Sequence, residues 1–206
     1  ENACHITYRD GTPIPEVTDL WGSGTGPTGA WAYYDNDPTK PRLYNWYAVM
    51  GIHDEASLLD ASLRKEFAPE GWHVPTDAEW TRLEEYLIAN GYNFNGTSYV
   101  CSPCTVYENL MAKSMASTTG WENSSNTGAV GSSNQLSNNS SGFNAFPVGY
   151  IAPSGQSRNE GEYTHFWTST ELNPIGNLNS YAWAHGLANA LSSTLRDDML
   201  LRFGLS

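Results

Sequence analysis

The sequence predicts a mixed α+β fold built from short antiparallel strands, two or three helices and long loops. One strongly marked helix is expected over residues 76–90, with weaker helical patterns at 54–67 and 107–117. Short strand patterns fill the last third of the chain. Between them, residues 120–142 are dominated by Asn, Ser, Thr and Gly, which is typical of a long surface loop with few apolar anchors. Helices that precede the strands, rather than alternating with them, indicate an α+β arrangement.

The helix over 76–90 carries signals for its start, its buried face and its end. Thr76 is a good N-cap, and Glu79 completes a capping box three residues later. The apolar residues of its buried face recur at helical spacing: Trp80, Leu83 and Leu87. Asn90 and Gly91 tolerate a left-handed backbone and are expected to end the helix.

The other helical patterns are weaker. Residues 54–67 place four apolar residues at near-helical spacing before Pro69 stops the run: Leu58, Leu59, Leu63 and Phe67. Residues 107–117 predict a second short helix. Residues 44–49 are compatible with either a short buried strand or a tight helical turn.

The β region begins where the polar loop ends. Residues 143–151 and 166–170 are expected to be strands, and residues 181–190 and 195–205 are expected to form two more strands joined around Ser192 and Ser193. The C-terminal third is therefore predicted to be mostly β.

Composition limits the possible partners. With 206 residues the chain fits one domain, and its net charge of −12, from 22 acidic and 10 basic residues, repels phosphate groups. Nucleic acid is therefore not an expected partner, and docking to anionic lipid is disfavoured. No stretch approaches the ~20 apolar residues of a membrane span, so direct membrane insertion is not expected. An acidic surface whose solubility comes from amides and hydroxyls is typical of secreted and cell-surface proteins.

The cysteines do not predict a metal site or a redox site. There are three, so at least one is unpaired or pairs outside the chain. Cys101 and Cys104 have redox-motif spacing, but they lie in a loop rich in Gly, Asn, Ser and Tyr. A small local disulfide or two plain thiols fits that setting better than redox catalysis. No further Cys or His lies close by for zinc, and no cofactor or metal is predicted.

No catalytic constellation is visible in the sequence. A serine nucleophile needs a positioned base, and no histidine lies in a Gly-x-Ser-x-Gly or HExxH context. His73 is expected to be structural, whereas His165 and His185 are expected to make surface contacts. Glu84 and Glu85 are adjacent on the predicted helix and are expected on its solvated side, so they do not form a catalytic pair. The chain is therefore predicted not to be an enzyme.

Several motifs together resemble one protein family. Residues 69–80 read Pro-Glu-Gly-Trp-His-Val-Pro-Thr-Asp-Ala-Glu-Trp, which resembles the signature of the Fibrobacter succinogenes major paralogous domain family. Further family motifs occur in the right order at residues 10–15, 43–49, 141–150 and 166–171, and residues 203–206 resemble the start of the family's closing strand. The resemblance covers essentially the whole chain.

The resemblance implies a single C-type-lectin-like domain over residues 1–206, with its closing strand truncated. Its relatives include formylglycine-generating enzymes and the variable proteins of diversity-generating retroelements. Such domains occur on secreted and lipid-anchored surface proteins of Bacteroidetes-type bacteria and on their phages, so an extracellular, cell-surface or virion location is expected. No catalytic activity is generally assigned to the family. The oxygenase relatives activate oxygen through copper at a late cysteine pair, but here no cysteine follows residue 104.

This sequence departs from the family at a pair of cysteines. Family members often have a cysteine just before the residue 69–80 signature, paired with a cysteine in the closing strand. Here Phe67 and Ala68 occupy that place, and the chain stops before the closing cysteine. The departure puts the pairing of the last strand in doubt.

The resemblance also directs attention to the C-terminal strands, because loops and last strands form the recognition face of a C-type-lectin-like fold. The alternative for any one apolar residue in 172–202 is a buried strand position. The predicted ligand-binding residues, chosen because they are aromatic or charged, are Trp167, Tyr181, Trp183, His185, Arg196 and Asp197. The Glu-Pro-Asn and Trp-Asn-Asp triplets of calcium-dependent lectins are missing, so no metal is expected there.

These observations lead to three functional hypotheses. The first is an extracellular adhesion or ligand-binding module for a cell-surface glycan or protein. Within it, the residue mixture of 172–202 fits diversification by a retroelement. The second is a structural subunit of a pilus tip, surface or phage-tail assembly, which would expose an uncovered strand edge to another surface or tail protein. The third is an enzyme of unfamiliar type, which would need a pocket with a strongly perturbed titratable group.

Overall fold

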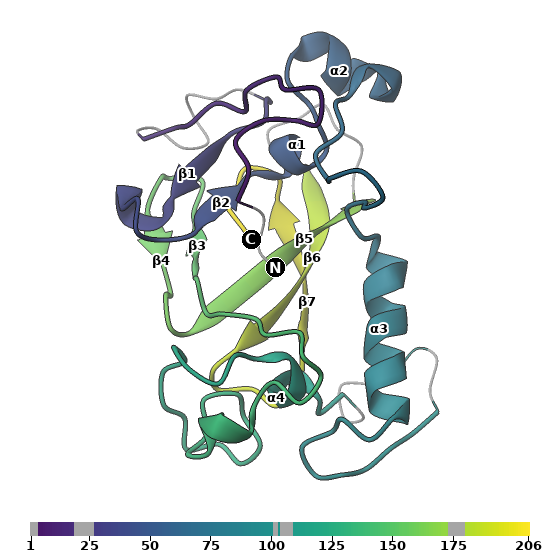
Figure 1. The fold of residues 1–206 in the computed structure, drawn as a ribbon, viewed down its shortest axis with the longest axis vertical. Coiled ribbons are helices and arrows are strands. Elements are labelled where there is room, and N and C mark those ends of the chain that lie inside the picture. The colour runs from purple at the N-terminus through teal and green to yellow at the C-terminus, as the bar shows by residue number, and fades with distance from the viewer. Residues whose placement is uncertain (1–3, 19–26, 101–102, 104–108, 173–179) are drawn as a thin grey trace.

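The computed structural model describes residues 4–18, 27–100, 103, 109–172 and 180–206 (Figure 1). Within these ranges the helices are α1 (Trp46–Val49), α2 (Glu55–Leu59), α3 (Asp77–Ala89) and α4 (Ala112–Met115), with 3-10 turns η1 (Tyr34–Asn36), η2 (Ala61–Leu63) and η3 (Gln135–Ser137). The strands are β1 (Trp31–Tyr33), β2 (Arg42–Tyr44), β3 (Tyr150–Ile151), β4 (Ser157–Arg158), β5 (Tyr163–Glu171), β6 (Tyr181–Ala188) and β7 (Leu195–Leu200). They form the antiparallel pairs β1–β2 and β3–β4 and the antiparallel sheet β5–β6–β7. The predicted α+β class is confirmed.

Helix α3 begins and ends as its capping signals predict. The Thr76 hydroxyl accepts a hydrogen bond from the Glu79 backbone N–H, and the Thr76 N–H donates to the Glu79 carboxylate at 2.8 Å. Bonds to the Thr76 backbone and side chain lower the pKa of Glu79 to about 2. The helix ends with Asn90 as its C-cap. In Figure 1, α3 runs along one side of the β5–β6–β7 sheet.

The weaker helical patterns are only partly correct. Within residues 54–67 the chain forms α2 and then η2, because Asp60 leaves the helical region and its carboxylate accepts the Ser62 N–H, which starts a new turn. Leu59 and Leu63, two of the residues at near-helical spacing, are 79% and 51% exposed. The helix predicted within residues 107–117 is the single turn α4.

After residue 160, the strands predicted over 166–170 and 181–190 are confirmed as β5 and β6, and the strand predicted over 195–205 is confirmed only as far as Leu200, after which the chain turns. The predicted strand over 143–151 is wrong for most of its length. Only Tyr150–Ile151 form a strand there, β3, while Ala145 and Gly149 each make one isolated bridge. Asn144 and Gly149 adopt positive φ angles of 62° and 67°, and Pro147 has no N–H to donate to a ladder. These three residues prevent a continuous strand.

The central sheet lies between two apolar clusters. One cluster contains α1, Trp167 of β5, and Ala182 and Ala184 of β6. The other contains the buried side of α3, the α4 region and Leu187 of β6. Because side chains alternate along β6, each face of the sheet packs into a different cluster.

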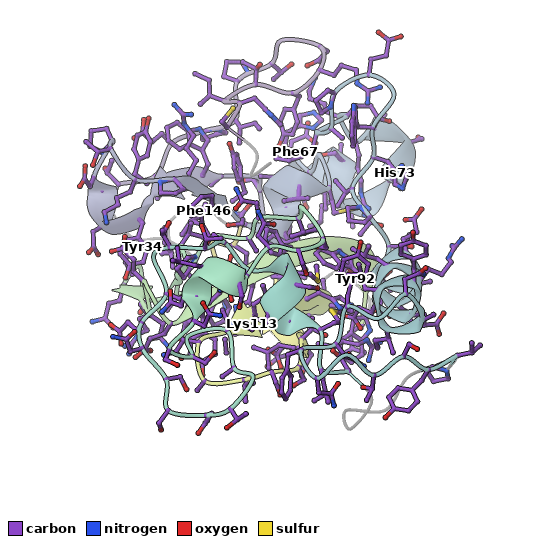
Figure 2. All side chains as sticks on the ribbon, turned by 60° about the horizontal axis from the view of Figure 1, so that its bottom comes forward. Tyr34, Phe67, His73, Tyr92, Lys113 and Phe146 are labelled. Carbon is purple, nitrogen blue, oxygen red and sulfur yellow. The ribbon has the colours of Figure 1, made fainter. Side chains whose placement is uncertain are left out.

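The polar loop at 120–142 has more anchors than its composition indicated. Trp121 and Val130 are buried in the cluster beside α3. Lys113 of α4 (labelled in Figure 2) donates from Nζ to the Asn138 side chain at 2.6 Å and to the Asn134 carbonyl at 2.9 Å. Burial lowers the pKa of Lys113. A half-buried ammonium that donates to several loop oxygens holds the loop against the domain.

Candidate functional site

The alternation of side chains divides the predicted ligand-binding residues between the two faces of the central sheet. His185 is opposite Phe166 of β5 and Arg196 of β7, and these residues lie on the side of α3, which we call the α3 face. Trp167 is opposite Ala184, which in turn is opposite Asp197. These residues lie on the opposite side, which we call the core face. The six predicted residues therefore cannot form one contact surface.

Two of them lie on the core face. Trp167 is only 3% exposed, and its indole N–H donates to the Tyr44 carbonyl at 2.9 Å. The Trp167 side chain is packed in the hydrophobic core, so it does not contribute to an exposed contact surface on these strands. Asp197 is half-exposed, with its Oδ2 3.1 Å from Nε2 of His165. His165 itself is 4% exposed, so its expected surface role is also wrong.

His185 lies on the α3 face but is not at the surface. It is 1% exposed, and its ring is stacked on Trp80 of α3 with centroids 5.2 Å apart and planes 5° from parallel. Its Nδ1 lies 3.0 Å from Glu84 Oε1 and its Nε2 lies 3.0 Å from Asp77 Oδ1. With both ring nitrogens engaged, the imidazole has no free nitrogen for a ligand or for proton transfer. The expected surface role of His185 is wrong, and the residue instead fixes α3 to the sheet.

Asp77 joins the buried histidine to the surface. Its carboxylate accepts two bonds from the guanidinium of Arg196, from Nε at 2.7 Å and from Nη2 at 2.8 Å. Hydrogen bonding from Arg196, ahead of that from His185, lowers the pKa of Asp77. A bidentate arginine–carboxylate pair has a fixed geometry, so the Arg196 side chain is held in one orientation.

The outer part of the α3 face combines aromatic and charged groups. The Arg196 guanidinium carbon lies 3.5 Å from the ring centroid of Trp183, in a cation–π arrangement. Trp183 is opposite Asp198, which is exposed, and Tyr181 is half-buried two residues before Trp183. The side chain of Arg196 is 45% exposed. We call Tyr181, Trp183, Arg196 and Asp198 the β6–β7 patch, of which Asp198 was not among the predicted residues.

Sequence reasoning missed the two acidic residues that support this patch. Glu84, expected on the solvated side of α3, has a side chain that is only 14% exposed and accepts a bond from the Thr194 hydroxyl at 2.9 Å. Asp77 was considered only as one residue of the family signature at residues 69–80, and no role was predicted for it. The signal was present, because residues 77, 80 and 84 share one face of a helix with Leu87. An acidic residue within an apolar helical stripe indicates a buried partner of opposite charge.

The remaining site predictions concern metals, membranes and cysteines. Within the described ranges, no group of three or more His, Cys, Asp or Glu residues could hold a metal ion. None of the helices described here is long and apolar enough to cross a membrane. The pairing of Cys101 and Cys104 lies outside the described residues.

Comparison with known proteins identifies the family of the chain. The model of the Fibrobacter succinogenes major domain family matches residues 1–198. No curated protein and no solved structure is detectably similar to the chain. The C-type-lectin-like architecture implied by the sequence motifs therefore stays a prediction. The family match spans nearly the whole chain, and the chain belongs to the Fibrobacter succinogenes major domain family.

Proposed function

We propose that the chain is an extracellular ligand-binding module that recognises a cell-surface glycan or protein through the β6–β7 patch. The observation that carries this proposal is the Trp183–Arg196–Asp77 arrangement, in which a partly exposed aromatic ring and a guanidinium are held in fixed orientation. A group that is ordered before binding loses little conformational entropy on binding. Tryptophan, tyrosine and arginine are also the residues most enriched in binding hot spots.

The chemistry of the patch suits a ligand with oxygen acceptors beside an apolar surface. The bonds to Asp77 use Nε and Nη2 of Arg196 and leave its Nη1 donors out of that pair. Tyr181 and Trp183 offer aromatic surface, on which the apolar face of a sugar or an apolar side chain can pack. The exposed carboxylate of Asp198 can accept hydroxyl or amide donors.

The test is a screen of the purified chain against arrays of glycans and of cell-surface proteins, with calcium and with chelator. Trp183→Ala and Arg196→Lys are compared with Tyr86→Ala, because Tyr86 is an exposed aromatic residue on α3 that does not belong to the patch. We expect a ligand whose affinity falls about tenfold or more in Trp183→Ala and is unchanged in Tyr86→Ala. Equal binding by Trp183→Ala and the unchanged chain would refute the patch as the site. Binding lost only in chelator would point to a cation-dependent site instead.

One observation favours a structural subunit as the second candidate. Strand β7 is at the edge of its sheet, and no described strand pairs with its outer side. Against strand addition, β7 carries Arg196, Asp197 and Asp198 in succession, and charged side chains on an edge strand oppose pairing with another chain. A chain that binds nothing on the arrays but co-purifies with pili, surface layers or phage tails would favour this candidate.

Diversification by a retroelement stays a prediction for this chain. The half-buried or exposed residues of the β6–β7 patch are the positions at which substitution would alter recognition, whereas Ala184 and His185 are buried. A near-identical template repeat beside the gene would support diversification, and a locus without a reverse transcriptase would contradict it.

A further inference from the structure

The accessible part of the Arg196 guanidinium is one planar face and one edge. The guanidinium carbon lies 3.5 Å from the centroid of the Trp183 ring, so the indole covers one side of the group. The edge that carries Nε and Nη2 is occupied by the Asp77 carboxylate, at 2.7 and 2.8 Å. The Arg196 side chain is nevertheless 45% exposed. A ligand therefore meets the outer face of the guanidinium and its Nη1 edge.

The acceptor that holds this guanidinium is itself anchored. Asp77 lies at the start of α3, and its Oδ1 is also 3.0 Å from Nε2 of His185. His185 is buried and its ring is stacked on Trp80, with centroids 5.2 Å apart. The orientation of Arg196 thus depends on the packed contact between α3 and the sheet. A cation that is held in one orientation is a flat platform that needs little ordering when a ligand binds.

The surroundings of this platform disfavour an anionic ligand. The charge of Arg196 is already paired with Asp77. The exposed carboxylate of Asp198 is on the same strand and the same face, opposite Trp183. The whole chain has a net charge of −12. A sulfate, phosphate or free carboxylate would approach a surface of its own sign, so the group that binds here is expected to be neutral.

The charge of the platform distinguishes between two kinds of neutral ring. The face of an aromatic ring is the negative part of its quadrupole and is attracted to a cation. The apolar face of a sugar ring presents C–H groups and has no such attraction to a guanidinium. A bare indole could stack with either ring, but the guanidinium covers the indole of Trp183 on this side. The outer face of Arg196 therefore favours an aromatic ring.

We propose that the β6–β7 patch binds an aromatic side chain of a protein ligand, which stacks on the outer face of the Arg196 guanidinium. The guanidinium then lies between that ring and Trp183, and its Nη1–H groups donate to a backbone carbonyl of the ligand. This inference rests on the proposed function and chooses the protein ligand over the glycan. A glycan that stacks directly on an aromatic ring of the patch is the alternative that the test must exclude.

The test compares matched probes in ligand-observed NMR titrations of the full chain. N-acetyl-phenylalaninamide is compared with N-acetyl-cyclohexylalaninamide, which has a similar shape but no π system, with N-acetyl-phenylalanine, which carries a carboxylate, and with methyl β-galactoside. We expect N-acetyl-phenylalaninamide to bind about threefold or more tightly than each of the others, the size of one cation–π contact. Absence of its binding, or equal binding of the cyclohexyl probe, would overturn the inference. Tighter binding of N-acetyl-phenylalanine would identify an anion site and overturn it as well.

A substitution at Arg196 separates stacking on the guanidinium from stacking on the indole. Arg196→Met retains an unbranched side chain and removes the cation, so the preference for the aromatic over the cyclohexyl probe should disappear. Arg196 is exposed and Asp77 keeps its contact with His185, so the variant should fold, which circular dichroism checks. Arg82→Met removes an exposed arginine of α3 outside the patch and should leave the preference unchanged. A preference that survives Arg196→Met would overturn the inference.

The behaviour of sugars distinguishes failure of this inference from failure of the proposed function. A glycan that loses affinity in Trp183→Ala but keeps or gains affinity in Arg196→Met stacks on the indole. That result would overturn the inference and leave the proposed function standing. If no probe binds and no array ligand depends on Trp183, both are wrong. An aromatic preference that is present in the unchanged chain and in Arg82→Met, and is lost in Arg196→Met, supports both.

Discussion

The two faces of β6 hold the same strand in place by different physics. On the core face, Ala182 and Ala184 are fully buried among apolar side chains, with Trp167 of β5 beside them. On the α3 face, His185 is equally buried but is bracketed by two carboxylates. Apolar packing is non-directional, whereas a buried network of hydrogen bonds is favourable only in one geometry. The core face therefore supplies stability, and the α3 face fixes the position of α3 and of the residues that continue to the surface.

The largest loss of stability is expected when a buried side chain of the core face is removed. Trp167→Ala removes a large buried ring and its bond to the Tyr44 carbonyl. We expect the free energy of unfolding to fall by about 3–5 kcal/mol, measured by urea denaturation. Trp183→Ala is the control, because Trp183 lies on the same sheet but is half-exposed, and it should cost much less. Similar losses in both variants would contradict the assignment of Trp167 to the core.

A smaller loss of stability is expected when His185, the buried residue of the α3 face, is replaced. His185→Leu leaves Glu84 with the Thr194 hydroxyl and Asp77 with Arg196, so neither acid is wholly unpaired. We expect a loss of about 2–3 kcal/mol in the same assay. The double variant His185→Leu/Glu84→Leu removes the leftover charge together with the histidine and should regain part of that loss. If the double variant is less stable than His185→Leu, Glu84 stabilises the folded chain through contacts other than the one with His185.

The smallest effect is the pH dependence of stability that Asp77 of the α3 face contributes. Arg196, followed by His185, holds the folded-state pKa of Asp77 below its ordinary value of 3.8. A lowered pKa stabilises the folded chain above the ordinary value, and this contribution is lost as pH falls through the folded-state pKa. The stability advantage of the unchanged chain over Asp77→Asn should therefore shrink as the pH falls below about 4. An advantage that is constant from about pH 5 to about pH 2 would contradict the pairing.

Local signals predicted much of the fold because they act over a few residues. The caps of α3 depend on Thr76, Glu79 and Asn90, all within the helix or next to it, and each lies where the sequence placed it. Helix α2 ended early because the capping preference of Asp60 outweighed the apolar spacing of residues 54–67. The strand expected over 143–151 is mostly absent, because the positive φ angles of Asn144 and Gly149 and the missing N–H of Pro147 interrupt a continuous extended strand.

The sequence by itself determined the family, the α+β class, the capped helix and the C-terminal strands, because motifs, caps and periodicity are local properties of the chain. Only the tertiary structure decided the site. Both Trp167 and Trp183 were predicted to bind ligand because they are aromatic. The sheet register places Trp167 in the core and Trp183 at the surface. The partners of His185 are Glu84 and Asp77, about a hundred residues away along the chain. Contacts at such separations depend on how whole elements pack, and no local pattern encodes them.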